Sequence, residues 1–274
     1  MPRDLHGKSI IVTGASSGIG AATAIACAKA GMPVVLNARR EEKLRKVADQ
    51  VERHGVKAAL VVGDVTDEGI SERLLNAAED ELGGLYAVFS NAGYGSELPV
   101  LKTDLDQVRA MFEVNFFASF ELVHLAARRL VEDSKPGHLL MCSSCLAKFT
   151  MPWHGVYSAT KAAQNHLCLS MRAELAADGI EVSSVHPVTT ATEFFEQSAR
   201  RSGKGNDSDV LDHVPKWLIQ KPEHVAAAVV KCLRRPKPEV WTSMLTRTFA
   251  AMATFSPRLL DMVMRRQLRR MKTG

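Results

Sequence analysis

The sequence predicts an α/β protein built on a doubly wound parallel sheet, and three features of the chain point to that class. Short runs rich in β-branched residues alternate with amphipathic segments of helical length along most of the 274 residues. Most of the runs are predominantly apolar, which is typical of strands buried between two layers of helices. A glycine-rich turn joins the first run directly to the first helical segment. We therefore expect a single domain with about seven strands and helices on both faces.

The predicted strands share a short apolar core that ends in a polar or glycine-containing turn. In chain order they are residues 9–13, 33–37, 57–62, 86–90, 138–142, 181–186 and 239–241.

The segments between these strands have the apolar spacing of helices that cover a sheet. Gly31, Gly55 and Gly179 follow predicted helix ends, and Asp104 is a candidate N-cap. The predicted helices are residues 19–30, 41–54, 67–82, 104–132, 156–177 and 225–233. Residues 189–220 lack clear periodicity, so we expect them to form a loop over the substrate.

The composition is that of an ordinary soluble domain, with 46% hydrophobic and 24% charged residues. It excludes disordered, collagen-like and disulfide-dense chains. The five cysteines are scattered, which favours a reducing compartment and predicts a cytoplasmic location. Cys142 and Cys145 have C-x-x-C spacing, but no second Cys or His cluster accompanies them, so we expect no metal site.

The first glycine-rich turn reads T-G-A-S-S-G-I-G over residues 13–20. Glycines between a strand and a helix allow the backbone to approach a phosphate, and the helix N-terminus supplies amide donors and a positive dipole. The turn therefore predicts a dinucleotide site with these residues as ligands: Gly14, Ser16, Ser17, Gly18, Ile19 and Gly20.

The end of the second predicted strand bears on the choice of cofactor. An acidic residue there usually binds the free ribose hydroxyls of NAD, but this chain has Arg39 and Arg40. Guanidinium groups suit a 2′-phosphate, so we predict NADP(H) in preference to NAD(H). The alternative is that the two arginines only pair with Glu41 and Glu42.

Further polar residues follow the later strands, at the sheet edge where ligands of open α/β sheets bind. Asp64 and Val65 follow the third strand, and the motif Asn91, Ala92 and Gly93 follows the fourth. Ser144 lies just past the fifth strand.

Two residues on the next predicted helix complete the set of candidates. Tyr157 and Lys161 are one helical turn apart and so share a face. Asn115 lies in an apolar helical stretch, where a polar side chain is either a functional group or a satisfied core residue.

These motifs, in this order and spacing, resemble the short-chain dehydrogenase/reductase family in its compact branch. The resemblance covers about residues 8–241. It implies a single-domain Rossmann fold and hydride transfer between a nicotinamide cofactor and a carbonyl or alcohol carbon. It also implies a homo-oligomer, either a dimer or a tetramer.

The resemblance assigns a role to each candidate. Tyr157 is the acid/base, Lys161 lowers the pKa of Tyr157 and holds the nicotinamide ribose, and Ser144 orients the substrate oxygen. Asn115 holds a water that connects Lys161 to solvent. Pro187 and Thr192 contact the cofactor, as do Tyr157 and Lys161.

The chain departs from the family pattern at three positions. Ser90 replaces the first Asn of the usual Asn-Asn-Ala-Gly motif, Val188 replaces the glycine that follows Pro187, and Thr190 replaces an aliphatic residue. The roles of Pro187 and Thr192 depend on the second departure.

The segments around the predicted site are apolar, which favours a hydrophobic carbonyl or alcohol substrate over a charged metabolite. They include Tyr94, Leu98, Phe149, Met151, Pro152, Trp153, Phe194, Phe195, Val210, Leu211, Trp217 and Leu218. Two alternatives remain: reduction of a 3-oxoacyl thioester, and a non-catalytic nucleotide-binding scaffold.

The net charge of +5 lies entirely in the tail. Residues 258–274 hold six of the 35 basic and one of the 30 acidic residues, which leaves 29 of each in residues 1–257. We predict a catalytic domain over residues 1–245 and a basic amphipathic helical extension over 246–274. Such a helix packs on its own subunit, joins an oligomer interface or makes a peripheral membrane contact. No nucleic-acid-binding motif accompanies it, so we expect no nucleic-acid partner.

Overall fold

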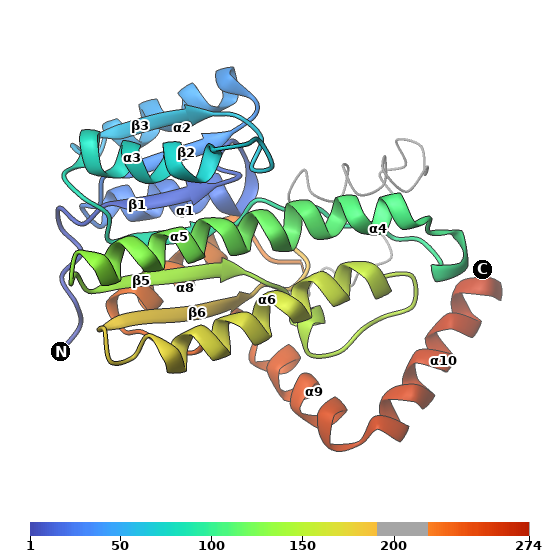
Figure 1. Ribbon diagram of the computed structural model, residues 1–274. Helices are drawn as coiled ribbons and strands as arrows, with labels where there is room; N and C mark the ends of the chain where they lie inside the picture. Colours follow the sequence, from blue (N-terminus) through green and yellow to red (C-terminus); the bar gives the residue numbers. More distant parts are fainter. Residues whose placement is uncertain (191–218, 274) are drawn as a thin grey trace.

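Parallel strands form one sheet in the order β3-β2-β1-β4-β5-β6-β7 (Figure 1). The computed structural model describes residues 1–190 and 219–273. The strands are β1 Ile10–Thr13, β2 Val34–Ala38, β3 Ala58–Val62, β4 Ala87–Ser90, β5 Gly137–Cys142, β6 Ile180–His186 and β7 Glu239–Trp241. The predicted doubly wound sheet is confirmed, and each predicted strand lies within one residue of its observed bounds.

The strand order reverses between β1 and β4, which are neighbours in the sheet but not in the chain. Thr13 pairs with Asn37 of β2, and Val12 pairs with Phe89 of β4. Because the strands are parallel, all their carboxyl ends lie on one edge. The crevice of an open α/β sheet lies at such a reversal, so the candidate residues that follow β1 and β4 meet there.

Helices cover both faces of the sheet, and each face has its own apolar core. One layer consists of α1 (Gly18–Lys29), α2 (Glu41–Glu52) and α8 (Pro222–Arg234). The other consists of α3 (Ile70–Leu82), α5 (Ala118–Glu132) and α6 (Gly155–Glu174), as Figure 1 shows.

The helix predicted over 67–82 begins later, at Ile70. Gly69 has φ +72°, a left-handed conformation that cannot continue a helix. The backbone N–H of Asp64 donates to the Asp67 carboxylate at 2.8 Å, so the residues before Ile70 form a turn.

The helix predicted over 104–132 has two parts. Asp104 caps α4 (Leu105–Phe112), accepting a bond from the N–H of Gln107 at 2.7 Å while the Gln107 side chain accepts from the N–H of Asp104. A π-helical turn, Glu113–Phe117, then separates α4 from α5. Single π turns inside α-helices are frequent at functional sites, and this one carries Asn115.

The segment predicted as a C-terminal extension, residues 246–274, is also divided. It comprises α9 (Met244–Phe255) and α10 (Pro257–Thr273), which break at Ser256 because the following proline disfavours helical geometry there. The two helices form a V that projects from the body (Figure 1).

Within the described residues, the span Leu105–Glu132 is long and apolar enough to cross a membrane by length and composition, with mean hydropathy 1.2. Its buried positions on α5, which include Leu122, Ala126 and Leu130, pack against the sheet. The span therefore serves as a core layer of this fold.

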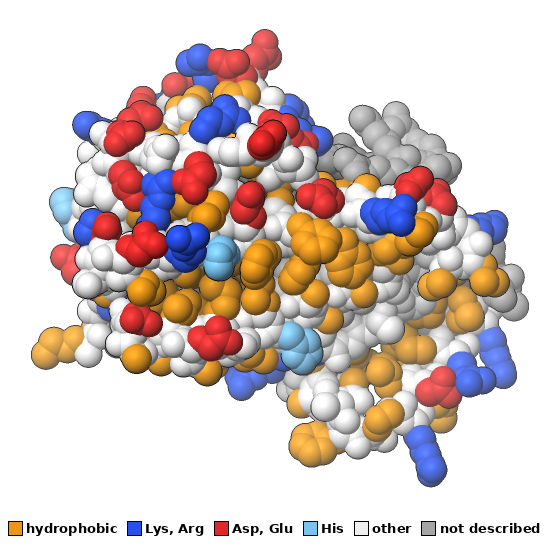
Figure 2. Space-filling view, in the orientation of Figure 1, with side chains coloured by type: hydrophobic (Ala, Val, Ile, Leu, Met, Phe, Trp, Pro, Cys, Tyr) orange, Lys and Arg blue, Asp and Glu red, His pale blue; other side chains and the backbone are white. Residues whose placement is uncertain are grey.

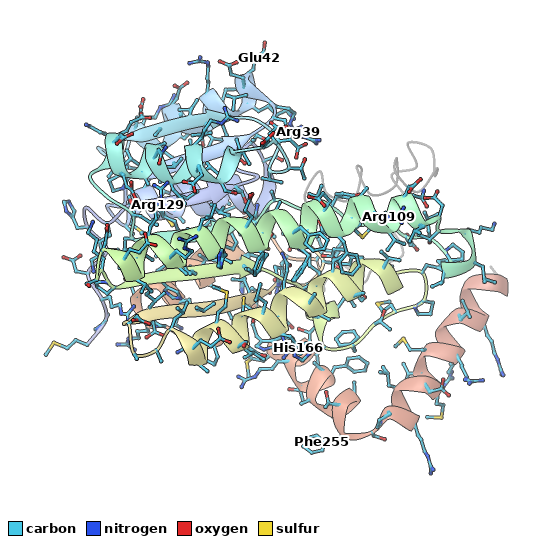
Figure 3. All side chains as sticks on the ribbon, in the orientation of Figure 1. Arg39, Glu42, Arg109, Arg129, His166 and Phe255 are labelled. Atoms are coloured by element: carbon cyan, nitrogen blue, oxygen red, sulfur yellow. The ribbon has the colours of Figure 1, made fainter. Side chains whose placement is uncertain are left out.

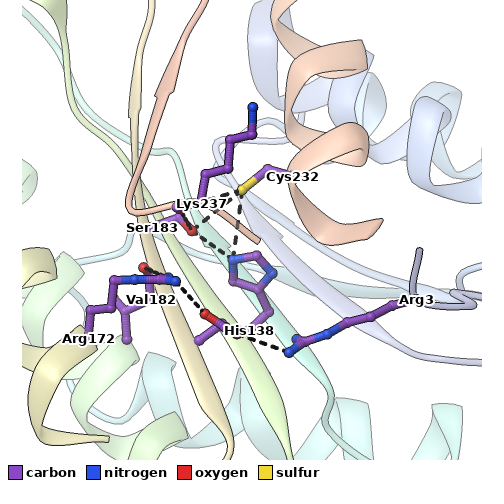
Figure 4. A network of polar contacts seen from close by, with 8 residues as sticks. Arg3, His138, Arg172, Val182, Ser183, Cys232 and Lys237 are labelled. Atoms are coloured by element: carbon purple, nitrogen blue, oxygen red, sulfur yellow. Dashed lines mark hydrogen bonds and ion pairs between the residues drawn. The ribbon is translucent and has the colours of Figure 1, made fainter. Parts of the chain in front are cut away.

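A buried polar network ties β5 to β6 and α8 at the edge of the sheet opposite the crevice (Figure 4). His138 Nε2 lies 2.8 Å from Ser183 Oγ, and Cys232 Sγ lies 3.5 Å from the same hydroxyl. Among the described residues, His138 Nδ1 finds no hydrogen-bond partner. Burial lowers the pKa of His138 to about 3, so the folded protein holds this imidazole neutral.

This histidine makes folding sensitive to acid. The pKa of this histidine is 6.5 in the unfolded chain, so the unfolded state binds a proton below that pH. The folded state does not bind the proton until the pH falls to about 3. Lowering the pH from about 7.5 to about 5.5 should therefore reduce the free energy of unfolding by about 1.4 kcal/mol through this one group.

Urea denaturation at the two pH values measures the effect. His138→Gln is expected to lose most of this pH dependence, whatever its stability at pH 7.5. The matched control is His166→Gln on the exposed side of α6, which should keep it. Equal pH dependence in wild type and His138→Gln would contradict the assignment.

Candidate active site

The turn between β1 and α1 forms one end of the crevice. Gly14 has φ +65°, and a Cβ atom on Gly20 would overlap the carbonyl oxygen of Gly14, so the turn requires glycine at both positions. The first turn of α1 holds no acidic residue, and the Ser17 side chain does not cap the helix. The positive end of the helix dipole is thus left for an external anion.

Arginines stand beside this turn. Arg40 donates from Nη2 to Ser16 Oγ at 3.2 Å and to Ser17 Oγ at 3.1 Å. Arg39 pairs with Asp64 at 3.3 Å, and its side chain is 59% exposed (Figure 3). None of these three contacts of Arg39 and Arg40 is to Glu41, which pairs with Arg45.

The residues after β3 and β4 lie close to the same turn. Thr13 Oγ1 accepts bonds from the N–H of Asn91 at 2.9 Å and of Ala92 at 3.0 Å. Val65 and Thr13 both line a small cavity of about 10 Å³, room for one water molecule. The structure thus brings the three predicted cofactor motifs to one edge of the sheet.

Ser144, Tyr157 and Lys161 form the other end of the crevice. Ser144 follows β5, and its side chain shares a hydrogen bond with the Tyr157 phenol on α6. Lys161 Nζ lies 5.8 Å from the centre of the Tyr157 ring and donates to the carbonyl of Cys142 at 2.7 Å. Ser143 Oγ donates to the Lys161 carbonyl at 2.8 Å, which fastens α6 to the end of β5.

Asn115 is fully buried in the π turn and binds two neighbouring segments. Its Oδ1 accepts from the N–H of Tyr94 at 2.9 Å, and its Nδ2 donates to the Tyr94 carbonyl at 2.9 Å and to Thr160 Oγ1 at 3.1 Å. The side chain therefore joins the loop after β4 to α6, while the main-chain carbonyl of Asn115 accepts a bond from Gln164 Nε2.

Burial controls the charge of the central pair. It lowers the pKa of Lys161 to about 8 and raises the pKa of Tyr157, against which the hydrogen bond from Ser144 acts. In the protein alone, Tyr157 therefore keeps its proton at neutral pH, and Lys161 titrates close to the physiological range.

The C-x-x-C cysteines are free thiols. Burial raises the pKa of Cys142, and it raises that of Cys145 to about 11. Both are protonated at neutral pH, which disfavours nucleophilic chemistry. Among the described residues, no group of three or more His, Cys, Asp or Glu side chains is arranged to hold a metal ion.

The segment after β6 passes directly behind Ser144. The Pro187 carbonyl accepts from the N–H of Cys145 at 3.0 Å, and the Ser144 carbonyl lies 2.8 Å from His186 Nδ1. Thr190 Oγ1 donates to the Val188 carbonyl at 2.9 Å. Thr192 and most of the predicted substrate loop lie outside the described residues, as do the apolar positions from Phe194 to Leu218.

An apolar wall flanks the catalytic end. The N–H of Leu98 donates to the Trp153 carbonyl at 2.9 Å, joining the loop after β4 to the loop before α6. Trp153 has φ +69°, an uncommon conformation for a bulky residue. Phe149 packs edge-on against Phe249 of α9, with ring centres 4.9 Å apart.

Sequence reasoning missed several polar residues that hold the site. Thr13 bonds to Asn91, and His186 bonds to Ser144. Gln164 bonds to Lys161 at 3.1 Å. The sequence signal for these residues was a polar side chain at a position of a strand or helix that the pattern predicts to be buried. Such a signal identifies a buried polar group but does not identify its hydrogen-bond partner.

The model of the short chain dehydrogenase family matches residues 8–202. The chain is 32% identical over 208 residues to 1-deoxy-11-beta-hydroxypentalenate dehydrogenase of Streptomyces exfoliatus, covering 75% of this chain and 76% of that enzyme. It is 34% identical over 224 residues to an uncharacterized oxidoreductase of Staphylococcus aureus, covering 81% and 94% of the two chains.

A third relative is much longer. The chain is 32% identical over 238 residues to the glycine betaine reductase of Emericella nidulans, which is 85% of this chain but only 18% of that protein.

Solved structures agree with the fold. A short-chain dehydrogenase/reductase from Mycobacterium marinum has a TM-score of 0.77 at 29% identity, covering 87% of this chain and 94% of that one. A Burkholderia phymatum member in complex with NAD has a TM-score of 0.84 at 22% identity, covering 94% and 96%.

The matched motifs, the sheet order and the relatives agree with one another. This chain belongs to the short-chain dehydrogenase/reductase family and is an NAD(P)-dependent oxidoreductase.

Proposed function

We propose that this protein transfers a hydride between NADP(H) and a hydrophobic carbonyl or alcohol, with Tyr157 as the acid/base. The observation that carries the proposal is the convergence of the Ser144 hydroxyl, the Tyr157 phenol and the Lys161 ammonium at the carboxyl ends of the strands. This cluster shares the sheet edge with the glycine turn, so residues of the turn would hold the phosphates of a dinucleotide and the cluster would act at its nicotinamide end.

The residues have distinct tasks in this mechanism. The bound nicotinamide supplies or accepts the hydride. Ser144 donates a hydrogen bond to the substrate oxygen, where negative charge develops during reduction. Tyr157, protonated at neutral pH because burial raises its pKa, gives its proton to that oxygen. In the oxidative direction the Lys161 ammonium favours the phenolate, so Tyr157 can take the proton back.

The donors around the glycine turn fit the phosphates of the cofactor. The α1 N-terminus and the Ser16 and Ser17 hydroxyls suit the pyrophosphate, since the turn presents no acidic side chain. Arg40 reaches across this turn and Arg39 stands beside it, which favours a 2′-phosphate over free ribose hydroxyls.

Arg40→Ala tests the choice of cofactor. Loss of a charged donor to the 2′-phosphate should weaken NADPH binding about tenfold or more while NADH binding changes little. Titration calorimetry with both cofactors measures the ratio, and Arg53→Ala on the exposed end of α2 serves as the control. Wild-type protein that binds NADH as tightly as NADPH would disprove the preference.

Tyr157→Phe tests the chemistry. Removing the phenolic proton should reduce kcat about a hundredfold or more, because no other proton donor replaces it at the substrate oxygen. NADPH affinity should change by less than about threefold. Activity above a few per cent of wild type would remove Tyr157 from this role.

The apolar wall formed by Leu98, Phe149 and Trp153 supports a hydrophobic substrate. Loss of NADPH fluorescence across a panel of ketones, with a 3-oxoacyl thioester and a small charged 2-oxo acid included, separates the substrate classes. No turnover of any member by cofactor-loaded protein would favour the scaffold alternative.

We infer further that the chain consists of a catalytic body, residues 1–245, and an extension, residues 246–274, that makes a peripheral contact with an anionic membrane. A cytoplasmic homo-oligomer is part of the same proposal. The extension combines an apolar surface on α9 with a cationic one on α10.

Large apolar side chains of α9 are exposed in the extension, with Met252 and Phe255 exposed by 50% and 91%. Phe255 points away from the body at the turn into α10 (Figure 3). Arg258, Arg265, Arg266 and Arg269 are exposed on α10, where blue and orange side chains stand together in Figure 2. Exposed apolar anchors beside arginines are typical of helices that lie at a lipid surface.

Charge reversal in the full-length chain tests this contact. Arg258→Glu with Arg266→Glu should weaken binding to phosphatidylserine-containing vesicles at least about tenfold, since each basic residue near an anionic surface contributes about 1 kcal/mol. Flotation with phosphatidylcholine vesicles gives the background. The control pair Arg53→Glu and Lys57→Glu carries the same charge change far from α10, and equal flotation of both double variants would eliminate the membrane contact.

A further inference from the structure

Gln164 lies behind the catalytic cluster, three residues after Lys161 on α6, and is completely buried. Its Oε1 accepts a hydrogen bond from Lys161 Nζ at 3.1 Å. Its Nε2 donates to the main-chain carbonyl of Asn115 at 2.5 Å and to Ser119 Oγ at 3.1 Å. One amide group therefore uses both its acceptor and its donor side to link Lys161, the π turn and α5.

This link is additional to the one that the family resemblance implies. The resemblance implies that Asn115 holds a water connecting Lys161 to solvent. In this structure the side chain of Gln164 also joins Lys161 directly to the main-chain carbonyl of Asn115. The packing of α6 fixes the position of this amide.

The same network includes one of the departures from the family pattern. Ser90 Oγ donates to Ser119 Oγ at 3.0 Å, and both residues are buried. Ser90 stands where the family usually has Asn. A short hydroxyl at this position leaves Ser119 within reach of Gln164, so the departure at Ser90 and the buried glutamine belong to one arrangement.

We propose that Gln164 is a positioning residue that holds the Lys161 ammonium in place beside Tyr157 and keeps it charged. The inference rests on the proposed role of Lys161 in supporting Tyr157. A buried ammonium needs acceptors, and Nζ donates to the Cys142 carbonyl and to Gln164 Oε1. Within the part of the chain that the structure describes, Gln164 thus supplies the side-chain acceptor for this charge.

Among the described residues, no carboxylate is one of the groups that set the charge of Lys161. The titratable groups that face it in the described structure are the Tyr157 phenol on α6 and the Cys142 thiol at the end of β5. The π turn and α5 present only the neutral partners Asn115 and Ser119 through Gln164. Without the glutamine oxygen, burial would favour the neutral amine more strongly.

Gln164→Met removes both hydrogen-bonding functions at nearly constant volume. Nitrogen NMR of lysine-labelled, cofactor-free protein, with Lys161→Met to assign the signal, follows the titration of Lys161 directly. Because burial lowers the pKa of Lys161 to about 8, we expect a wild-type midpoint near that value, and Gln164→Met should lower it by about one pH unit. In alcohol oxidation, the rise of kcat with pH should move to higher pH by a similar amount, because Tyr157 loses the positive charge that favours its phenolate.

Asn165→Leu is the matched control. Asn165 is the next residue on α6 and is equally buried, but its Oδ1 accepts a bond from Ser184 of β6, whereas Gln164 Oε1 accepts from Lys161. Its substitution should change stability without moving the Lys161 midpoint or the pH profile. If the methionine variant does not fold, Gln164→Glu serves in its place, since a carboxyl oxygen still accepts a hydrogen bond from Lys161 Nζ. In Gln164→Glu the Lys161 midpoint should not fall below that of wild type.

The outcomes separate this inference from the proposed function. An unchanged Lys161 midpoint in Gln164→Met, or a midpoint that falls equally in Asn165→Leu, would overturn the role of Gln164 even if Tyr157→Phe is inactive. A lowered midpoint together with an unmoved pH profile of kcat would also overturn it. Full activity of Tyr157→Phe would instead refute the proposed function, while the NMR measurement would still report on the contact between Gln164 and Lys161.

Discussion

The arrangement of the site depends on one hydroxyl at the point where the strand order reverses. Thr13 ends β1, and its Oγ1 accepts two backbone N–H groups from the segment that follows β4. Parallel strands bring their carboxyl ends to one edge, but they do not determine how the loops beyond them sit. These two hydrogen bonds fix the loop after β4 against the glycine turn. Asn115 then joins the next part of that loop to α6.

Much of the fold follows from local sequence signals. Seven short, mostly apolar runs predict the seven strands of the described residues, because a strand buried on both faces has few other compositions. The misplaced helix boundaries have local causes. Gly69 adopts a left-handed conformation, and the π turn inserts an extra residue between α4 and α5 without any proline or glycine to signal it.

The motifs predicted which residues gather at the crevice, whereas the bonds that hold them depend on the packing of elements distant in the chain. Arg40 lies close in sequence to Glu41 and Glu42, yet it donates to Ser16 and Ser17 across the turn. In the sequence, Gln164 is indistinguishable from an ordinary polar residue of a helix. Its role becomes visible only in the structure, where it contacts the π turn of residues 113–117. A sequence pattern contains residue types and spacings along one element, and these contacts join two or three elements.

The contact between Phe249 and Phe149 joins the final helices to the residues that follow Ser144. Phe149 lies four positions past Cys145, the 3₁₀ residue that follows Ser144, and its ring packs edge-on against that of Phe249 at 4.9 Å. The family model matches residues 8–202, so Phe249 on α9 lies beyond the matched part of the chain. A substitution on α9 can therefore change the surroundings of Phe149 without altering any of the family motifs.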